Sequence, residues 1–207
     1  MTFEMAADSK ITSVKVGETY DTACDYSLNI IVMSRVLLER LLRGAEVMGA
    51  KNFERDIIAA NIGALNIRGH KIDTYAKVID SLQSYYDISM ELLSGEYRDL
   101  FNPENPVFTK VRDDMPAIYG ICSKATNSLI ADGCIIKGTV ENSILFRGVH
   151  VAEGAVIRNS IVMQDSYISA NAKVNCAILD KDVVIKPGRE ISGAETYPIY
   201  IGKGITV

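Results

Sequence analysis

Aliphatic residues recur every 17 positions in the last third of this chain. They form three interleaved columns: Ile144, Ile161 and Ile178; Val151, Ile168 and Ile185; and Val140, Ile157, Val174 and Ile191. A fixed period shared by several apolar columns predicts a stacked solenoid, in which each coil packs its apolar corners against the next coil. We therefore expect all three columns to pack in the core of the C-terminal part.

Within one coil the apolar positions are six, five and six residues apart, from Val151 to Ile157, Val162 and Ile168. Three short steps per coil predict a triangular prism, the left-handed parallel β-helix of hexapeptide repeats. Turn-forming residues separate the strands: Gly133, Gly138, Gly148, Gly154, Asn171, Asp182 and Gly188. We expect about four coils over residues 128–191, and residues 197–207 either add a partial coil or cap the open end.

The apolar pattern of the first half is shorter and less regular. It predicts strands over residues 11–16 and 27–33, a hairpin over 65–78 with its turn near Gly69, and a short helix over 53–60. A longer helix over 35–47 would begin at the N-cap Ser34 and end at Gly49, and a last helix over 82–93 would be capped by Asp80 or Ser81. This α/β order is too short for a complete doubly wound sheet.

Composition narrows the classes of function. The net charge is −4 without a cluster of basic residues, which argues against a nucleic-acid partner. The sequence has no run of about 18 apolar residues, so we expect no membrane span. The N-terminus lacks the pattern of a secretory signal. The scattered cysteines, Cys24, Cys122, Cys134 and Cys176, indicate reduced thiols in a cytoplasmic protein, and we expect Cys134 and Cys176 to be small buried residues.

One candidate for catalysis lies in the predicted prism. His150 is its single histidine, and prisms of this kind serve acyltransferases, in which a histidine acts as general base. Alternation with Val149 and Val151 predicts that His150 points outward, where a solvated or interface histidine is the competing interpretation. The sequence contains no Gly-rich phosphate loop and no pair of carboxylates placed for a metal.

Four segments in order resemble one enzyme family. They are YSLNIIVMSRVLL (26–38), SLQSYYDISMELL (81–93), PVFTKVRDDMPAIYG (106–120) and NSLIADGCIIKGTVENS (127–143). Together they resemble the bacterial glucose-1-phosphate adenylyltransferases, the ADP-glucose pyrophosphorylases of glycogen synthesis. The resemblance implies the remnant of a GT-A-like nucleotidyltransferase domain over residues 1–101, a linker over 102–123 and a left-handed β-helix over 124–207.

The resemblance begins partway into the family pattern. The family's Gly-rich nucleotide loop, its first metal-binding Asp and its Glu-Lys-Pro motif have no counterpart here. We therefore expect the chain to correspond to the second half of the catalytic domain plus the prism, as a truncated or N-terminally cut form.

Further departures concern the metal and the sugar. The family uses Mg²⁺, and Val78 takes the place of an Asp that helps to hold it, so we expect no cofactor in this chain. Asp80 lies two positions later and serves better as a helix cap than as a ligand. Asn29, in the family's sugar-pocket strand, could still bond a sugar, which leaves Asn29 and Asp80 as a remnant of the sugar pocket.

These losses resemble the non-catalytic GlgD-type subunits of the family. The resemblance implies a regulatory role in glycogen biosynthesis through assembly with a catalytic glucose-1-phosphate adenylyltransferase subunit, as a homo- or hetero-oligomer formed through the β-helix. Lys110, Arg112, Arg147 and Arg158 could form an anion or effector face, and solvated surface charges are the competing interpretation of the same four residues. A hexapeptide acyltransferase using His150 is the alternative.

Overall fold

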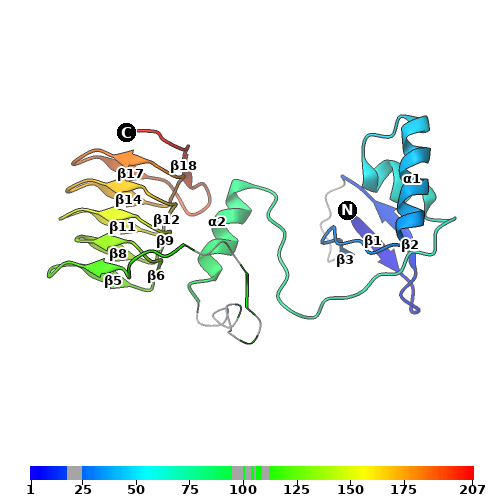
Figure 1. The fold of residues 1–207 in the computed structure, drawn as a ribbon, viewed down its shortest axis with the longest axis horizontal. Coiled ribbons are helices and arrows are strands. Elements are labelled where there is room, and N and C mark those ends of the chain that lie inside the picture. Colours follow the sequence, from blue (N-terminus) through cyan, green and yellow to red (C-terminus); the bar gives the residue numbers. More distant parts are fainter. Residues whose placement is uncertain (18–24, 95–99, 101–103, 105, 109–111) are drawn as a thin grey trace. The chain divides into compact units, whose positions relative to one another are not determined.

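Three parallel sheets form the walls of a prism in the C-terminal part of the chain (Figure 1). The computed structural model describes residues 1–17, 25–94, 100, 104, 106–108 and 112–207. The first wall contains β4 (Ile118–Tyr119), β7 (Ile135–Ile136), β10 (His150–Val151), β13 (Tyr167–Ile168) and β16 (Val184–Ile185). The second contains β5 (Lys124–Thr126), β8 (Thr139–Glu141), β11 (Val156–Arg158), β14 (Lys173–Asn175) and β17 (Glu190–Ser192). The third contains β6 (Leu129–Ile130), β9 (Ile144–Leu145), β12 (Ile161–Val162), β15 (Ala177–Leu179) and β18 (Ile199–Ile201).

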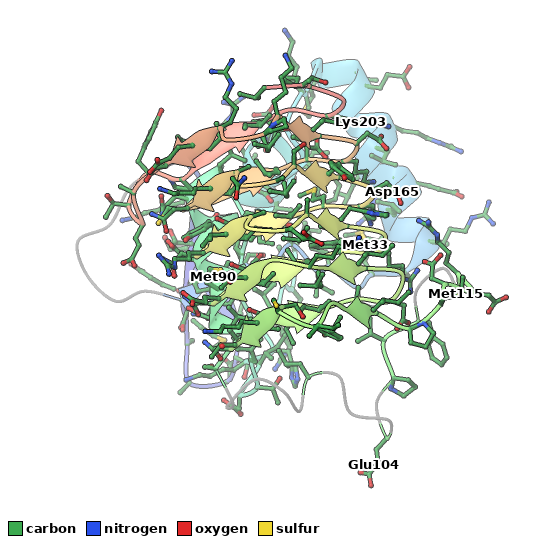
Figure 2. All side chains as sticks on the ribbon, turned by 90° about the vertical axis from the view of Figure 1, so that its left-hand side faces the viewer. Met33, Met90, Glu104, Met115, Asp165 and Lys203 are labelled. Atoms are coloured by element: carbon green, nitrogen blue, oxygen red, sulfur yellow. The ribbon has the colours of Figure 1, made fainter. Side chains whose placement is uncertain are left out.

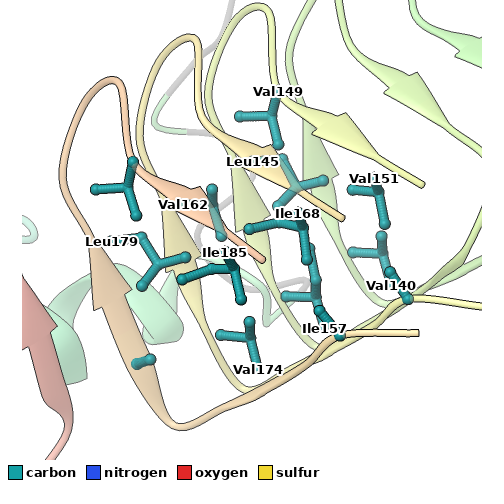
Figure 3. Close-up of a cluster of buried hydrophobic side chains, with 14 of the residues drawn as sticks. Val140, Leu145, Val149, Val151, Ile157, Val162, Ile168, Val174, Leu179 and Ile185 are labelled. Carbon is teal, nitrogen blue, oxygen red and sulfur yellow. The ribbon is translucent and has the colours of Figure 1, made fainter. Parts of the chain in front are cut away.

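Two of the three predicted columns line the interior of this prism. In the first wall Val151 pairs with Ile168, which pairs with Ile185, and all three side chains are buried (Figure 3). In the second wall Val140, Ile157 and Val174 align in the same way and are also buried. The predicted parallel β-helix, with its 17-residue coils, is therefore confirmed.

The third column faces outward, so it does not line the interior of the prism as the other two columns do. The interior residues of the third wall are Leu145, Val162 and Leu179. Because successive side chains of a strand point to opposite faces, Ile144, Ile161 and Ile178 lie on the outer surface of that wall. Ile161 and Ile178 are nevertheless buried, since another element covers them.

The repeated Asn-Ser pairs form two ladders along one corner of the prism. Asn142 and Asn159 have left-handed backbones, and the Asn142 side-chain amide donates a 2.7 Å hydrogen bond to the amide oxygen of Asn159. Beside them, the buried Ser160 accepts a hydrogen bond from Ala177 N, and its own main-chain N–H bonds Ser143 Oγ. Side chains thus satisfy main-chain groups at a corner that the wall hydrogen bonds cannot reach.

The remaining turns follow the sequence prediction. Left-handed backbones occur at the expected turn positions Gly133, Gly148, Gly154, Asn171, Asp182 and Gly188. Gly138 is required for a different reason. A Cβ atom there would lie 2.8 Å from the carbonyl oxygen of Ala152 and closer still to that of Ala155.

The C-terminal tail closes the last coil. Strand β18 pairs with β15, and Thr206 bridges to Val184 in β16. Val207 packs against the core, and its main-chain N–H donates a 2.9 Å hydrogen bond to the Val184 carbonyl. The tail therefore both extends the third wall and covers this end of the prism.

Residues 1–78 form a separate compact unit. Its antiparallel sheet has the order β2 (Ile11–Lys15), β1 (Thr2–Met5), β3 (Asp25–Tyr26), which confirms the expected strand at residue 11. Helix α1 (Arg35–Met48) begins at the N-cap Ser34 and ends at the left-handed Gly49, as expected. The second expected helix is present as a π-helical turn, η1 (Phe53–Ile58), followed by the 3₁₀ turn η2 (Ala59–Asn61).

Two predictions for this unit are wrong. The segment 27–33 is not a strand, because Asn29 takes a left-handed backbone (φ 60°) and its N–H bonds Ser27 Oγ. Residues 65–78 form no hairpin either. Instead, Ile67 and Arg68 lie beside the start of β2, where the Ile11 N–H bonds the Ile67 carbonyl and Lys10 bridges to Arg68.

The second compact unit, residues 79–207, includes the last expected helix, α2 (Leu82–Glu91). By sequence we placed this helix in the domain of residues 1–101, and its contacts instead join it to the prism. Within the described ranges, no helix is both long and apolar enough to cross a membrane.

Candidate functional site on the outer face of the prism

The capping of α2 fixes where the helix begins. Ser81 is the N-cap, and its Oγ accepts a 3.0 Å hydrogen bond from Ser84 N. Ser84 Oγ in turn accepts hydrogen bonds from the N–H groups of Ser81 and Asp80. The predicted cap is thus Ser81 and not Asp80, because Ser81 has the extended backbone from which a side chain reaches the first free N–H of the helix.

An aromatic face of α2 covers the outward column of the third wall. Tyr86 is 4% exposed and packs with Ile161 and Ile178, and the partly buried Tyr85, Met90, Phe146 and Met163 surround them. Removing these isoleucines from water stabilises the docked helix by the hydrophobic effect. The outward column that we first expected in the core is therefore the seat of α2. In Figure 1, α2 lies beside the prism on the side of β12 and β18, and Figure 2, which labels Met90 of α2, views the prism from the opposite side.

Two polar contacts fix the position of the helix on the prism. The Tyr86 hydroxyl donates a 2.6 Å hydrogen bond to the carbonyl oxygen of Asn159. The Gln83 amide donates 2.8 Å hydrogen bonds to the carbonyl oxygen of Glu195 and to Asp87. Burial raises the pKa of Tyr86, with a further contribution from Cys176, so its phenol remains a proton donor at all ordinary pH values.

The four basic residues expected to form an anion face are not all at one corner. Lys110 lies outside the described residues. Arg112 contacts two carboxylates, Asp114 at 3.0 Å and Asp165 at 3.5 Å. The Arg147 carbonyl accepts a 3.0 Å hydrogen bond from Asp165 N, which places Arg147 at the same corner as Asp165.

Arg158 lies at a different corner of the coil. It belongs to the end of β11, one residue before Asn159, and its guanidinium lies 2.7 Å from the Glu141 carboxylate on the preceding coil. Strand β12 separates this corner from the turn that contains Asp165. The structure thus groups Arg112 with Arg147 and leaves Arg158 in an ion pair between coils.

His150 lies on the outer face of the first wall, as alternation predicted. Val149 and Val151 are fully buried on either side of it, and the imidazole stacks on the Tyr167 ring with centroids 5.6 Å apart. An aromatic stack holds the imidazole but does not activate an acceptor for acyl transfer. Acyl transfer by His150 remains an untested alternative.

The residues that we expect at the family's metal and sugar positions lie in different units. Asn29 belongs to the first unit, where its neighbours Leu28 and Ile30 line a largely apolar cavity of about 720 Å³. Val78 ends that unit, and Asp80 precedes α2 in the second. The hydrocarbon side chain of Val78 offers no ligand atom, so the residues present do not fit a Mg²⁺ site. Among the described residues, no three His, Cys, Asp or Glu side chains are grouped to hold a metal.

Cys134 and Cys176 are buried thiols, as expected, whereas Cys122 is exposed. Cys134 is fully enclosed in the core, and burial raises the pKa of its thiol. Cys176 takes a left-handed backbone (φ 48°), as Asn142 and Asn159 do at equivalent turns of earlier coils. These three thiols are free, and Cys24 lies outside the described residues.

The α2 seat was the feature that sequence reasoning missed. Ile161 and Val162 are adjacent in one strand, so their side chains point to opposite faces of the third wall. Both residues also belong to apolar columns with the 17-residue period. An apolar column on both faces of one wall is a signal that something covers the outside. The Tyr85-Tyr86 pair provides that cover, although in the sequence it stands out only as part of a family motif.

Comparison with known proteins supports both halves of this description. Residues 117–196 match the family model of the GlmU-like C-terminal hexapeptide. The chain is 39% identical over 180 residues to the glycogen biosynthesis protein GlgD of Bacillus subtilis, which covers 86% of this chain and 52% of that protein. It is 33% identical over 168 residues to the glucose-1-phosphate adenylyltransferase of Acetivibrio thermocellus, covering 79% of this chain and 39% of that protein.

A shorter match is closer in sequence. Over 70 residues the chain is 50% identical to the glycogen biosynthesis protein GlgD of Geobacillus stearothermophilus, covering 33% of this chain and 20% of that protein. The chain thus spans about half the length of the Bacillus GlgD protein and less of the other two.

Proposed function

Since the chain belongs to the glucose-1-phosphate adenylyltransferase family and is of the GlgD type, we propose that it acts in glycogen biosynthesis as a regulatory, non-catalytic subunit. Its partner would be a catalytic glucose-1-phosphate adenylyltransferase, which forms ADP-glucose and pyrophosphate from ATP and glucose 1-phosphate. The complex would form in the cytoplasm. The activity belongs to that partner, and this chain would modify it through assembly.

The observation that carries the non-catalytic role is Val78. Phosphoryl-type transfer depends almost wholly on positioned cations that neutralise charge on the phosphates. An aliphatic side chain cannot coordinate Mg²⁺, and Asp80 stands beside the Ser81–Ser84 capping box of α2. No step of the reaction is therefore assigned to residues of this chain.

The exposed end of the prism supports assembly through this domain. Tyr119 belongs to the same column as the buried Ile136, yet it is 53% exposed in the first coil. Ile121, two residues later, is fully exposed. Strands β4, β5 and β6 are the edge of their walls at this end, and such edges pair readily with other chains. The opposite end is covered by residues 205–207.

The proposal is tested by reconstitution with the catalytic subunit. Purified protein of this chain is mixed with a catalytic glucose-1-phosphate adenylyltransferase, and the complex is measured by sedimentation. Pyrophosphate-dependent breakdown of ADP-glucose is then assayed for each protein alone and for the mixture. We expect no activity from this chain alone and altered kinetics in the mixture. Activity of this chain alone, or the absence of a complex, would contradict the proposal.

An effector role is proposed for the corner of Arg112 and Arg147, with Lys110 as a further candidate. The corner would take a sugar phosphate, because guanidinium groups bond phosphate oxygens in pairs. Arg158 contributes less, since it lies at another corner beside Glu141. A titration with sugar phosphates tests this role.

A further inference from the structure

The chain enters α2 from a segment without helix or strand. Residues 71–80 contain neither, and the boundary between the compact units falls between Val78 and Ile79. Val78, Ile79 and Leu82 are each exposed. The first part of α2 therefore receives its fixed position from the prism and not from the residues before it.

Two short hydrogen bonds and one apolar contact hold α2 on the prism. Tyr86 and Gln83 both donate to main-chain carbonyl groups of the prism, those of Asn159 and Glu195. Because the acceptors belong to the backbone, the helix position follows the backbone of the prism rather than a mobile side chain. The apolar part of the contact centres on Tyr86 over Ile161 and Ile178.

The length of α2 makes docking and folding one event. The helix has 10 residues, and isolated helices shorter than about 12–15 residues are marginal in water. Once released from the prism, α2 would lose its helical structure. Its Ser81–Ser84 capping box, which fixes the N–H groups of Asp80 and Ser81, would open at the same time.

We propose that α2 is a conformational latch, and that Tyr86 is the positioning residue that keeps it closed. Closed, it covers Ile161 and Ile178 and fixes the N–H groups of Asp80 and Ser81 in the capping box. Open, it exposes that column and frees residues 79–81. The inference deepens the proposed regulatory function and rests on it for its consequence: a partner bound to the prism would change residues 79–81 through α2.

Hydrogen exchange of the whole chain tests the latch directly. Tyr86→Phe removes one hydroxyl and keeps the ring, so the buried contact remains. A hydrogen bond worth about 0.5–1.5 kcal/mol corresponds to a roughly two- to twelvefold loss of protection, which we expect in peptides over 79–92. Peptides from parts of the prism that belong to its interior cluster alone, such as 165–174, should not change. Gln83→Ala should act in the same direction.

Tyr167→Phe is the matched control, because Tyr167 lies on the first wall against His150. It should leave the protection of 79–92 unchanged. Unchanged protection of 79–92 in Tyr86→Phe would overturn the latch. An equal loss of protection through α2 and the prism interior would also overturn it, since that result describes global unfolding.

Exchange in the presence of the catalytic subunit tests the regulatory consequence. We expect complex formation to change the protection of 79–92 by a factor similar to that of Tyr86→Phe. A complex that leaves 79–92 unchanged would overturn the regulatory coupling while the proposed function stands. If no complex forms, the proposed function and the coupling both fail, and Tyr86→Phe alone still decides the latch.

Discussion

The hydroxyl of Tyr86 in α2 donates a 2.6 Å hydrogen bond to the carbonyl of Asn159, 73 residues later in the chain. Asn159 occupies a left-handed turn of the Asn ladder, between coils whose register is fixed by strand pairing. The repeat therefore holds in place the carbonyl group that accepts the hydrogen bond from Tyr86. A helix docked on a solenoid in this way takes its position from main-chain atoms that the pairing of the strands holds in register.

The first prediction compares two members of the outward column. Ile161 is fully buried beneath α2, whereas Ile144 is only partly buried. Ile161→Ala should lower the free energy of unfolding by about 2–4 kcal/mol, because it leaves a cavity under the helix. Ile144→Ala should cost clearly less. Denaturant unfolding of both variants measures the difference, and equal losses would show that α2 does not cover Ile161 in solution.

The second prediction concerns a close approach of two backbones. Gly138→Ala places a methyl group against the Ala152 and Ala155 carbonyls, which cannot move without breaking the strand register. We expect a loss of at least about 3 kcal/mol, or failure to fold. Gly188→Ala is the control, because its φ is +67° but nothing lies within 4 Å of the added Cβ. Its left-handed backbone should cost about 1 kcal/mol.

The 17-residue period sufficed to predict the walls, the coil length and the turn positions, because each coil repeats the same local chemistry. It placed both Ile161 and Val162 in apolar columns, although only Val162 lines the interior. The burial of Ile161 depends on α2, a distant segment that the period does not include. The wrong strand over 27–33 has a local cause in the left-handed Asn29, which no hydrophobic pattern reveals.

The third prediction is a pH dependence of the first unit. The Arg55 guanidinium and the N–H groups of Lys51 and Asn52 hold the pKa of Asp56 far below its usual value. A carboxylate whose pKa is lowered by folding adds stability above its unfolded pKa of about 4, and that stability disappears as the pH falls through the folded pKa. The first unit should therefore destabilise progressively below about pH 4.

Circular dichroism or near-ultraviolet melting at pH 3 and pH 6 measures this dependence. Asp56→Asn should reduce the difference between the two pH values, since the amide does not titrate. Asp8→Asn, in the same unit, is the control for a change of net charge. An unaltered pH dependence in Asp56→Asn would show that other carboxylates govern it.

The fourth prediction concerns association through the exposed end of the prism. Ile121→Asp places a charge on a fully exposed side chain, so the fold should be unaffected. If this end is an interface, burying the unpaired carboxylate is costly and association should weaken at least about tenfold. Val47→Asp, on the exposed face of α1, is the matched control. Sedimentation at several concentrations, with and without the catalytic subunit, distinguishes the two variants.

The last prediction tests the anion role of the corner formed by Arg112 and Arg147. Asp165 lies 3.5 Å from Arg112 and competes with any phosphate for that guanidinium. Asp165→Asn keeps a residue that tolerates the left-handed backbone (φ 56°) and removes the competing charge. We therefore expect it to strengthen sugar-phosphate binding about three- to tenfold, because the phosphate no longer has to displace an exposed ion pair between Arg112 and Asp165. Arg112→Ala should weaken binding.

Asp182→Asn is the control for this pair of variants, because Asp182 has the same turn geometry and lies beside Lys203 instead. It should leave affinity unchanged. Isothermal titration with a sugar bisphosphate and with inorganic phosphate separates recognition of the sugar from simple attraction of an anion. Absence of binding at millimolar concentration in both the original chain and Asp165→Asn would remove the anion role, because the corner would then fail even with one of the two carboxylates beside Arg112 neutralised.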